Sequence, residues 1–176
     1  MQIPVPYYSQ YLDVTSAEWQ PRACGLVCLK MLLEASHLQT PSLNEMLVQG
    51  EAIGAYGESG WRHDGLVALG KQYGARLERC EWRQSETKTS DELSSEGIAF
   101  LVSQLRAHRP VAVSAIKNFE IADKFHMVVL TGFEEEGEVV TGFYYHDSDT
   151  KVKGEGENLF VPFDTFHAKW RRMAIY

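Results

Sequence analysis

The chain has 176 residues, of which 44% are hydrophobic and 23% are charged, a balance typical of a soluble domain with a substantial core. Its formal net charge of -7 makes it a poor electrostatic match for nucleic-acid phosphates, so a nucleic-acid partner is not expected. The apolar stretches are far shorter than a membrane span, which argues against a membrane protein.

Cysteine usage and the N-terminal segment bear on the compartment. The chain has 3 cysteines, at positions 24, 28 and 80. An odd and small number is not a disulfide framework and favours a reducing environment. No basic stretch followed by an apolar run stands at the N-terminus, so no signal peptide is expected. These features together predict a cytoplasmic protein.

The first half of the chain predicts mainly helices. A proline-containing arm over residues 1–23 leads into residues 24–36, where apolar side chains recur at helical spacing. Ser42 and Glu45 have the spacing of a capping box, which marks the start of a second helix. Further along, the pattern predicts a helix over 61–73, a short strand over 75–82, an exposed loop over 83–95 and a helix over 98–107.

The second half of the chain predicts strands. Runs rich in β-branched and aromatic residues indicate strands over 111–115, 127–133, 139–145 and 172–176. The acidic segment 134–138 is typical of a hairpin turn. Helices followed by antiparallel strands indicate an α+β fold. Because no repeat or boundary divides the chain, we expect residues 1–176 to form a single domain.

Cys24 is the most informative residue for function, because it stands where a loop becomes an apolar helix. The positive end of the helix dipole favours the thiolate, which is the nucleophilic form of the side chain. Cys28 lies one turn further along and should face the core, and Cys80 is also expected to be structural. The sequence therefore predicts a thiol-dependent enzyme with Cys24 as its nucleophile.

His126 is the best placed of the 6 histidines to act as the base that such a nucleophile needs. It opens a predicted strand, which can bring its imidazole beside a helix start. The next strand ends near Asp147, whose carboxylate can reach the imidazole and fix its tautomer. Asp149 is a reserve for this orienting role. His63 is a rival base, although its place at a helix start favours a first-turn or capping role.

Several segments, taken together in chain order, carry a resemblance to a known family. The most specific are Cys24-Gly25 at the start of the predicted helix and the run His126-Met127-Val128-Val129-Leu130-Thr131-Gly132-Phe133. The others are VPYYSQ at 5–10, the segments 60–66 and 110–114, and Asp147. Over nearly its whole length the chain resembles the papain-like cysteine peptidases, and more closely the C39-like family.

The resemblance implies a papain-like α+β fold in which N-terminal helices pack on a C-terminal antiparallel sheet, as a single C39-like peptidase domain over residues 1–176. It implies that Cys24 is the nucleophile, His126 the base and Asp147 the orienting carboxylate. The expected activity is hydrolysis of a peptide or isopeptide bond in a peptide or protein substrate. No cofactor is implied.

The resemblance also assigns an oxyanion donor. The family has a glutamine in an extended segment before the cysteine, and here that residue is Gln10, with Gln20 as second choice. One such donor typically lowers the barrier by about 3 kcal/mol. The chain departs from the family pattern after Asp147, where Ser148 stands in place of the usual proline.

Other functions remain open on the sequence alone. The same Cys24–His126 pair could serve an acyltransferase or a deamidase, because these enzymes differ only in the acceptor that enters the cleft. The altered site around Ser148 also allows a peptidase fold that has lost catalysis and serves only as a binding module. A metal site is not expected, because Cys24 and Cys28 lack a second ligand pair and the segment after Asp147 lacks the later ligands of a calcium loop.

Overall fold

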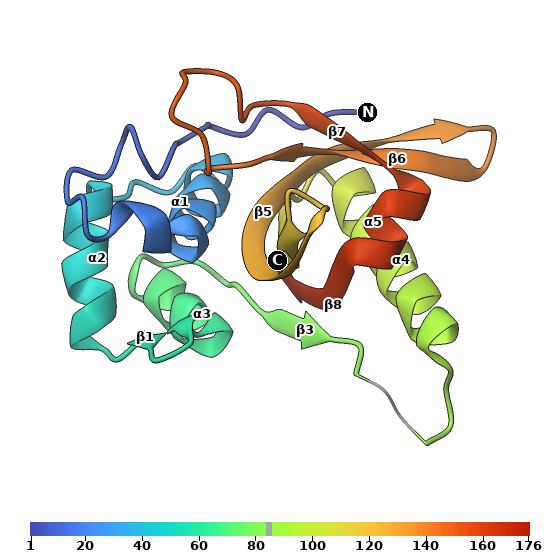
Figure 1. The fold of residues 1–176 in the computed structure, drawn as a ribbon, viewed down its shortest axis with the longest axis horizontal. Helices are drawn as coiled ribbons and strands as arrows, with labels where there is room; N and C mark the ends of the chain where they lie inside the picture. The colour runs from blue at the N-terminus through green and yellow to red at the C-terminus, as the bar shows by residue number, and fades with distance from the viewer. Residues whose placement is uncertain (84–85) are drawn as a thin grey trace.

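The structure is a computed structural model that describes residues 1–83 and 86–176, and the side chains of all of these except 122 and 123. Figure 1 shows α1 (Cys24–Ala35), α2 (Leu43–Ala52) and α3 (His63–Gln72) grouped on one side of the molecule. The main sheet lies on the other side, where α4 (Ser90–Arg106) and α5 (Phe163–Lys169) contact its strands. Within the described residues, no helix is long and apolar enough to cross a membrane.

Side-chain caps mark the starts of α2 and α4. The Ser42 hydroxyl accepts the Glu45 N–H, and the Glu45 carboxylate accepts the Ser42 N–H, so the predicted capping box is confirmed. Thr89 and Glu92 form the same arrangement at the start of α4. α4 therefore begins directly after Thr89, and the exposed loop predicted over 83–95 ends earlier than expected. Residues 84 and 85 of that loop lie outside the described residues.

α1 is buried along most of its length. All of its residues from Gly25 to Leu33 are buried, so the helix lies inside the core rather than on its surface. Lys30, which helical spacing would place on the exposed side, is buried as well. Its Nζ contacts Glu34 Oε1 at 2.7 Å and the Pro41 carbonyl oxygen at 2.9 Å. These partners offset the cost of removing the ammonium group from water.

The main sheet has strand order β3-β8-β4-β5-β6-β7, and every neighbouring pair is antiparallel. The predicted strands in the second half are present with different ends, most of all β5, which extends in both directions and takes in residues 134–136 of the predicted hairpin turn. β7 and α5 are additional, because each is too short to give a clear periodic pattern. The strands are β1 (Tyr56–Gly57), β2 (Gly60–Trp61), β3 (Arg79–Glu81), β4 (Val111–Lys117), β5 (Ile121–Glu136), β6 (Val139–His146), β7 (Leu159–Pro162) and β8 (Trp170–Ile175).

β5 positions the candidate site. Its first half pairs with β4, where His126 lies opposite Ala115, and its second half pairs with β6. The strand already begins at Ile121, so the prediction that His126 opens it is wrong, because the ladder with β4 extends further back. β6 ends at His146, so the chain leaves the sheet at Asp147. Its side chain then contacts His126 on β5.

The N-terminal arm lies against β5 and the loop that follows β6. The Ile3 N–H donates to the Thr131 carbonyl oxygen at 2.6 Å, beyond the point where the pairing of β4 with β5 ends. Further along the arm, the Gln10 N–H donates to the Ser148 carbonyl oxygen at 2.9 Å. The first bond ties the arm to β5, and the second ties it to the loop that presents Asp147.

Candidate active site

Cys24 is the first residue of α1, as predicted. A short 3-10 helix, η1 (Gln20–Arg22), brings the chain to this point, and Trp61 Nε1 donates a hydrogen bond to the Arg22 carbonyl oxygen at 2.9 Å. No described side chain caps α1. The thiol therefore lies at the uncapped positive end of a buried helix, which favours the thiolate.

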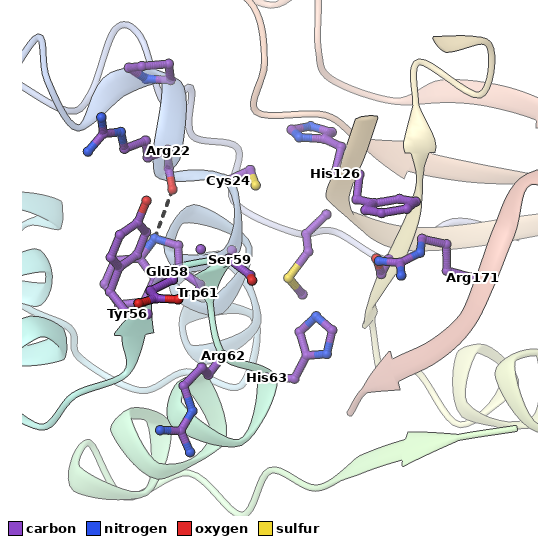
Figure 2. Close-up of a pocket in the computed structure, with 17 residues that line it drawn as sticks. Arg22, Cys24, Tyr56, Glu58, Ser59, Trp61, Arg62, His63, His126 and Arg171 are labelled. Carbon is purple, nitrogen blue, oxygen red and sulfur yellow. Dashed lines mark hydrogen bonds between the residues drawn. The ribbon is translucent and has the colours of Figure 1, made fainter. Parts of the chain in front are cut away.

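The structure brings His126 and Asp147 into direct contact. His126 Nε2 lies 2.6 Å from Asp147 Oδ1, and the two residues are only 6% and 7% exposed. The backbone N–H of Asp149 also donates to Asp147 Oδ1, at 2.8 Å, and holds the carboxylate in place. Because Nε2 faces the carboxylate, Nδ1 is the ring nitrogen left for Cys24. Figure 2 shows Cys24 and His126 facing each other from α1 and β5.

The protonation states of the three groups depend on one another. Burial alone would raise the pKa of Cys24, but the hydrogen-bonded His126 imidazolium outweighs burial and lowers that pKa. Burial would lower the pKa of His126, but the Cys24 thiolate and the Asp147 carboxylate raise it to about 10. Burial likewise opposes ionisation of Asp147, and His126 nevertheless lowers its pKa. The three shifts together favour a thiolate, an imidazolium and a carboxylate over the neutral forms.

The reserve carboxylate, Asp149, has a different partner. Its side chain forms an ion pair with Lys117 at the end of β4. Only its backbone N–H reaches the site, through the bond to Asp147. The geometry thus separates the two candidates for the orienting role, since Asp147 and not Asp149 contacts the imidazole.

The two glutamines proposed as oxyanion donors occupy different places. Gln10 is 2% exposed, and its Oε1 accepts a hydrogen bond from the Ser148 hydroxyl at 2.9 Å. It lies beside the loop that carries Asp147 and is not among the residues that line the cleft. Gln20 Nε2 donates to the carbonyl oxygens of Tyr11 and Val14, so its amide hydrogens hold the arm. The oxyanion role of Gln10 stays a prediction.

His146, the last residue of β6 and the neighbour of Asp147, is buried. Its Nε2 lies 3.1 Å from the Val5 carbonyl oxygen, and its Nδ1 accepts the Asn158 N–H at 3.0 Å. Both ring nitrogens are used in a neutral tautomer, and burial lowers the pKa of this histidine. The N-terminal arm covers it, a contact that the local sequence does not indicate.

The other cysteines fit structural roles. Cys28 is buried one turn below Cys24, and burial raises its pKa well above the usual value. Cys80 is half-buried on β3 and does not line the cleft. Cys24 is the cysteine that lies beside both a histidine and open space.

A cleft of about 900 Å³ opens in front of Cys24 and His126. One wall comes from the β1–β2 hairpin, where Trp61 packs against Tyr56, and the other comes from β4, β5 and β8. Trp61 thus both anchors the core and lines the cleft. His63 lies at the start of α3 and also lines the cleft, and burial lowers its pKa.

Phe125 and Arg171 are among the residues of the cleft wall that sequence reasoning missed. Phe125 directly precedes His126, and an aromatic residue next to the predicted base is the sequence signal for a cleft-lining side chain. Arg171 stands in the short basic run Lys169-Trp170-Arg171-Arg172, whose positive charge is the sequence signal for an anion-binding side chain. Among the described residues, no group of three or more His, Cys, Asp or Glu side chains is placed to hold a metal ion.

The chain and its fold are similar to known peptidases. A sequence model described as the Peptidase_C39 like family matches residues 2–175. No curated protein sequence matches the chain. A solved putative C39-like peptidase from Bacillus anthracis has a TM-score of 0.66 at 18% identity, covering 99% of this chain and 96% of that chain.

Two further solved structures are peptidase parts of transporters. A double glycine motif protease from an AMS/PCAT transporter, in complex with the leader peptide, has a TM-score of 0.59 at 17% identity, covering 99% of this chain and 91% of that chain. The peptidase domain of Streptococcus ComA, a bi-functional ABC transporter, has a TM-score of 0.61 at 15% identity, covering 89% of this chain and 90% of that chain.

These similarities confirm the predicted α+β, papain-like fold, in which N-terminal helices pack against an antiparallel sheet. The matched family and fold support a cysteine peptidase-like function. Because the family model covers nearly the whole sequence, the chain belongs to the Peptidase_C39 like family.

Proposed function

We propose that this protein is a cysteine peptidase that cleaves a peptide or isopeptide bond through an acyl-enzyme on Cys24. The observation that carries the proposal is the buried contact of 2.6 Å between His126 Nε2 and Asp147 Oδ1, beside a cysteine at a helix start. A purely structural histidine in a core does not require a thiol on one side and a carboxylate on the other. An acyl-transfer enzyme does.

In the proposed reaction, the Cys24 thiolate attacks the substrate carbonyl carbon, and the carbonyl oxygen becomes an oxyanion. His126 then gives its Nδ1 proton to the leaving amine, and the first product departs as the thioester forms. His126 next accepts a proton from a water molecule that attacks the thioester. The acid product then departs, and the Cys24 thiolate is regenerated. Asp147 keeps the imidazole oriented and stabilises its charged form.

The oxyanion requires donors near Cys24. The first N–H groups of α1 have no partner within the helix, and the Cys24 N–H is therefore one donor. The second donor proposed is the amide of Gln10, whose Oε1 is already engaged by Ser148. Removing one such donor typically costs about 3 kcal/mol in the barrier.

A peptide is the proposed substrate. The similar double glycine motif protease was solved with its leader peptide bound, which supports a peptide-binding cleft in this fold. In the present chain the cleft beside Cys24 has a volume of about 900 Å³ and is lined by both polar and aromatic side chains. Concave sites of this kind are the usual place for ligand recognition.

The test combines reactivity and cleavage. The purified protein is incubated with a peptide mixture prepared from a whole-cell digest, and new chain ends are identified by mass spectrometry. We expect the wild type and Cys80→Ala to generate the same new ends, and Cys24→Ala to generate none. Products joined to a second peptide would indicate acyl transfer instead, and glutamine converted to glutamate without cleavage would indicate deamidation.

A second readout needs no substrate. Alkylation of each cysteine by iodoacetamide is followed by peptide mass spectrometry as a function of pH. We expect Cys24 to react well below pH 8, while Cys28 stays unreactive, because thiolate character controls this reaction. A Cys24 that titrates like a free thiol, with a pKa of about 8.5, would overturn the proposal, as would cleavage by Cys24→Ala at the wild-type rate.

A further inference from the structure

Arg171 stacks on the ring of Phe125 on the sheet side of the cleft, and this pair is called the Arg171–Phe125 platform below. Its guanidinium carbon lies 3.4 Å from the centroid of the Phe125 ring, which is 59% exposed. Its Nη1 also donates a long hydrogen bond of 3.4 Å to the Ser114 hydroxyl. Figure 2 shows Arg171 on the same side of the pocket as His126, across from the β1–β2 hairpin. Arg171 is exposed, and these two contacts hold its guanidinium on the wall of the cleft.

The other arginines of the cleft wall already have carboxylate partners. Arg62 contacts Asp64 at 2.8 Å, and Arg22 contacts Glu18 at 3.6 Å. Among the side chains that the structure describes, none places a carboxylate within ion-pair distance of Arg171. Glu81 is near enough to influence the pKa of Arg171, but its carboxylate forms ion pairs with two other arginines, Arg79 and Arg83.

The chemistry of this platform favours an anion with two oxygens. Guanidinium presents a planar fork of N–H donors that matches a carboxylate, and stacking one face on an aromatic ring leaves the edge free to bind. Partial burial against the cleft wall lowers the pKa of Arg171, although the side chain stays exposed to a ligand. In a chain with a net charge of -7, a cation on the cleft wall also locally offsets the repulsion between the protein and an acidic peptide.

We infer that Arg171, supported by Phe125, is a specificity-determining subsite that binds a carboxylate of the peptide substrate. The inference rests on the proposed peptidase function, because it concerns a substrate bound in the same cleft. The carboxylate can come from an Asp or Glu side chain near the scissile bond, or from the C-terminus of a peptide that ends within the cleft. Both sources present a carboxylate to the guanidinium of Arg171.

The experiment starts from the peptides that the wild type cleaves in the digest. A cleaved peptide with a Glu near the scissile bond is synthesised with Glu or Gln at that position, each with a free or an amidated C-terminus. We measure kcat and KM for all four with the wild type, Arg171→Met and Arg171→Lys. Arg62→Met is the matched control, since that cleft arginine already pairs with Asp64.

We expect the wild type to prefer one carboxylate form over its amide by about 10-fold or more in kcat/KM, the usual effect of a hydrogen bond to a charged group. The preference should appear mainly in KM, because ground-state binding is lost. Arg171→Met should abolish it and Arg171→Lys should keep only part, because lysine retains the charge without the fork. Arg62→Met should retain the full preference. Glu against Gln, or free against amidated terminus, identifies the source.

The outcomes separate this inference from the proposed function. Cys24-dependent cleavage without preference for either carboxylate would overturn the subsite and leave the peptidase function standing. A preference that persists in Arg171→Met would also overturn it. Should Arg171→Met fail to fold, the wild-type preference and Arg171→Lys still decide the question. Absence of any Cys24-dependent cleavage would overturn the proposed function, and the subsite with it.

Discussion

Replacing Asp147 by Asn tests how much the carboxylate contributes to lowering the pKa of the Cys24 thiol. The change keeps the size of the side chain but removes the charge that contacts His126 at 2.6 Å. A hydrogen bond to a charged group contributes about 1.5–3 kcal/mol, and about 1.4 kcal/mol corresponds to one pKa unit. We therefore expect the pKa of His126 to fall, and the apparent pKa of the Cys24 thiol to rise by about 1–2 units.

The sign follows from the coupled protonation states. The pKa of Asp147 is lowered in the folded protein, so its negative charge is present above that value and is lost as the pH falls through it. The upper limit of the charged pair is the pKa of His126, about 10. The wild type should therefore alkylate at Cys24 as a thiolate across the neutral range. In Asp147→Asn the midpoint of the alkylation profile should move up by about 1–2 pH units, which slows alkylation by up to about 10- to 100-fold at pH values below the wild-type midpoint.

The assay is the pH profile of Cys24 alkylation, read by peptide mass spectrometry for both proteins. Asp149→Asn is the matched control, because it makes the same chemical change two residues away, where the carboxylate pairs with Lys117 and not with His126. Its profile should stay close to that of the wild type. A profile for Asp147→Asn that matches the wild type, in a variant with an unchanged thermal transition, would refute this reasoning.

Three other changes have defined outcomes. Lys117→Met removes the cation that pairs with Asp149 and helps to lower the pKa of the orienting carboxylate, so the acid limb of the alkylation profile should move to higher pH by less than about one unit; an unmoved limb would contradict this. Gly65→Ala would place a Cβ 2.6 Å from the Ala55 Cα, which is backbone and cannot rotate away. Urea unfolding should therefore show a loss of about 1–3 kcal/mol despite the better helix propensity of alanine, and a gain in stability would oppose it. The pKa of buried His146 is lowered, so the unfolded chain protonates first and stability should fall as the pH drops below about 6.5; the fall should be smaller in His146→Gln, as urea midpoints at pH 7.5 and 5.5 would show.

Local signals in the sequence predicted much of the framework correctly. The capping box at Ser42 and Glu45 depends on residues three positions apart, and its hydrogen bonds form as expected. Cys24 begins α1 because the change from loop to apolar helix is also local. The same kind of signal was present at Thr89 and Glu92 but was overlooked, since the surrounding polar segment suggested a loop.

Contacts between segments that are distant in the sequence were harder to predict. Asp147 and Asp149 are chemically equivalent on paper, and only the exit of β6 from the sheet decides which one meets His126 and which one meets Lys117. His146 is buried because the arm near Val5, far away in the sequence, covers it. No local periodicity encodes such docking.

By itself, the sequence determined the helical start at Cys24, the strand character around His126 and the order of the chemically active residue types, because these depend on neighbours within a few positions. The tertiary structure decided which carboxylate reaches His126, where Gln10 lies, and that Arg171 and Phe125 share the cleft with Cys24. Those relations depend on strand register and on how the arm packs across the sheet, and both are properties of the whole chain.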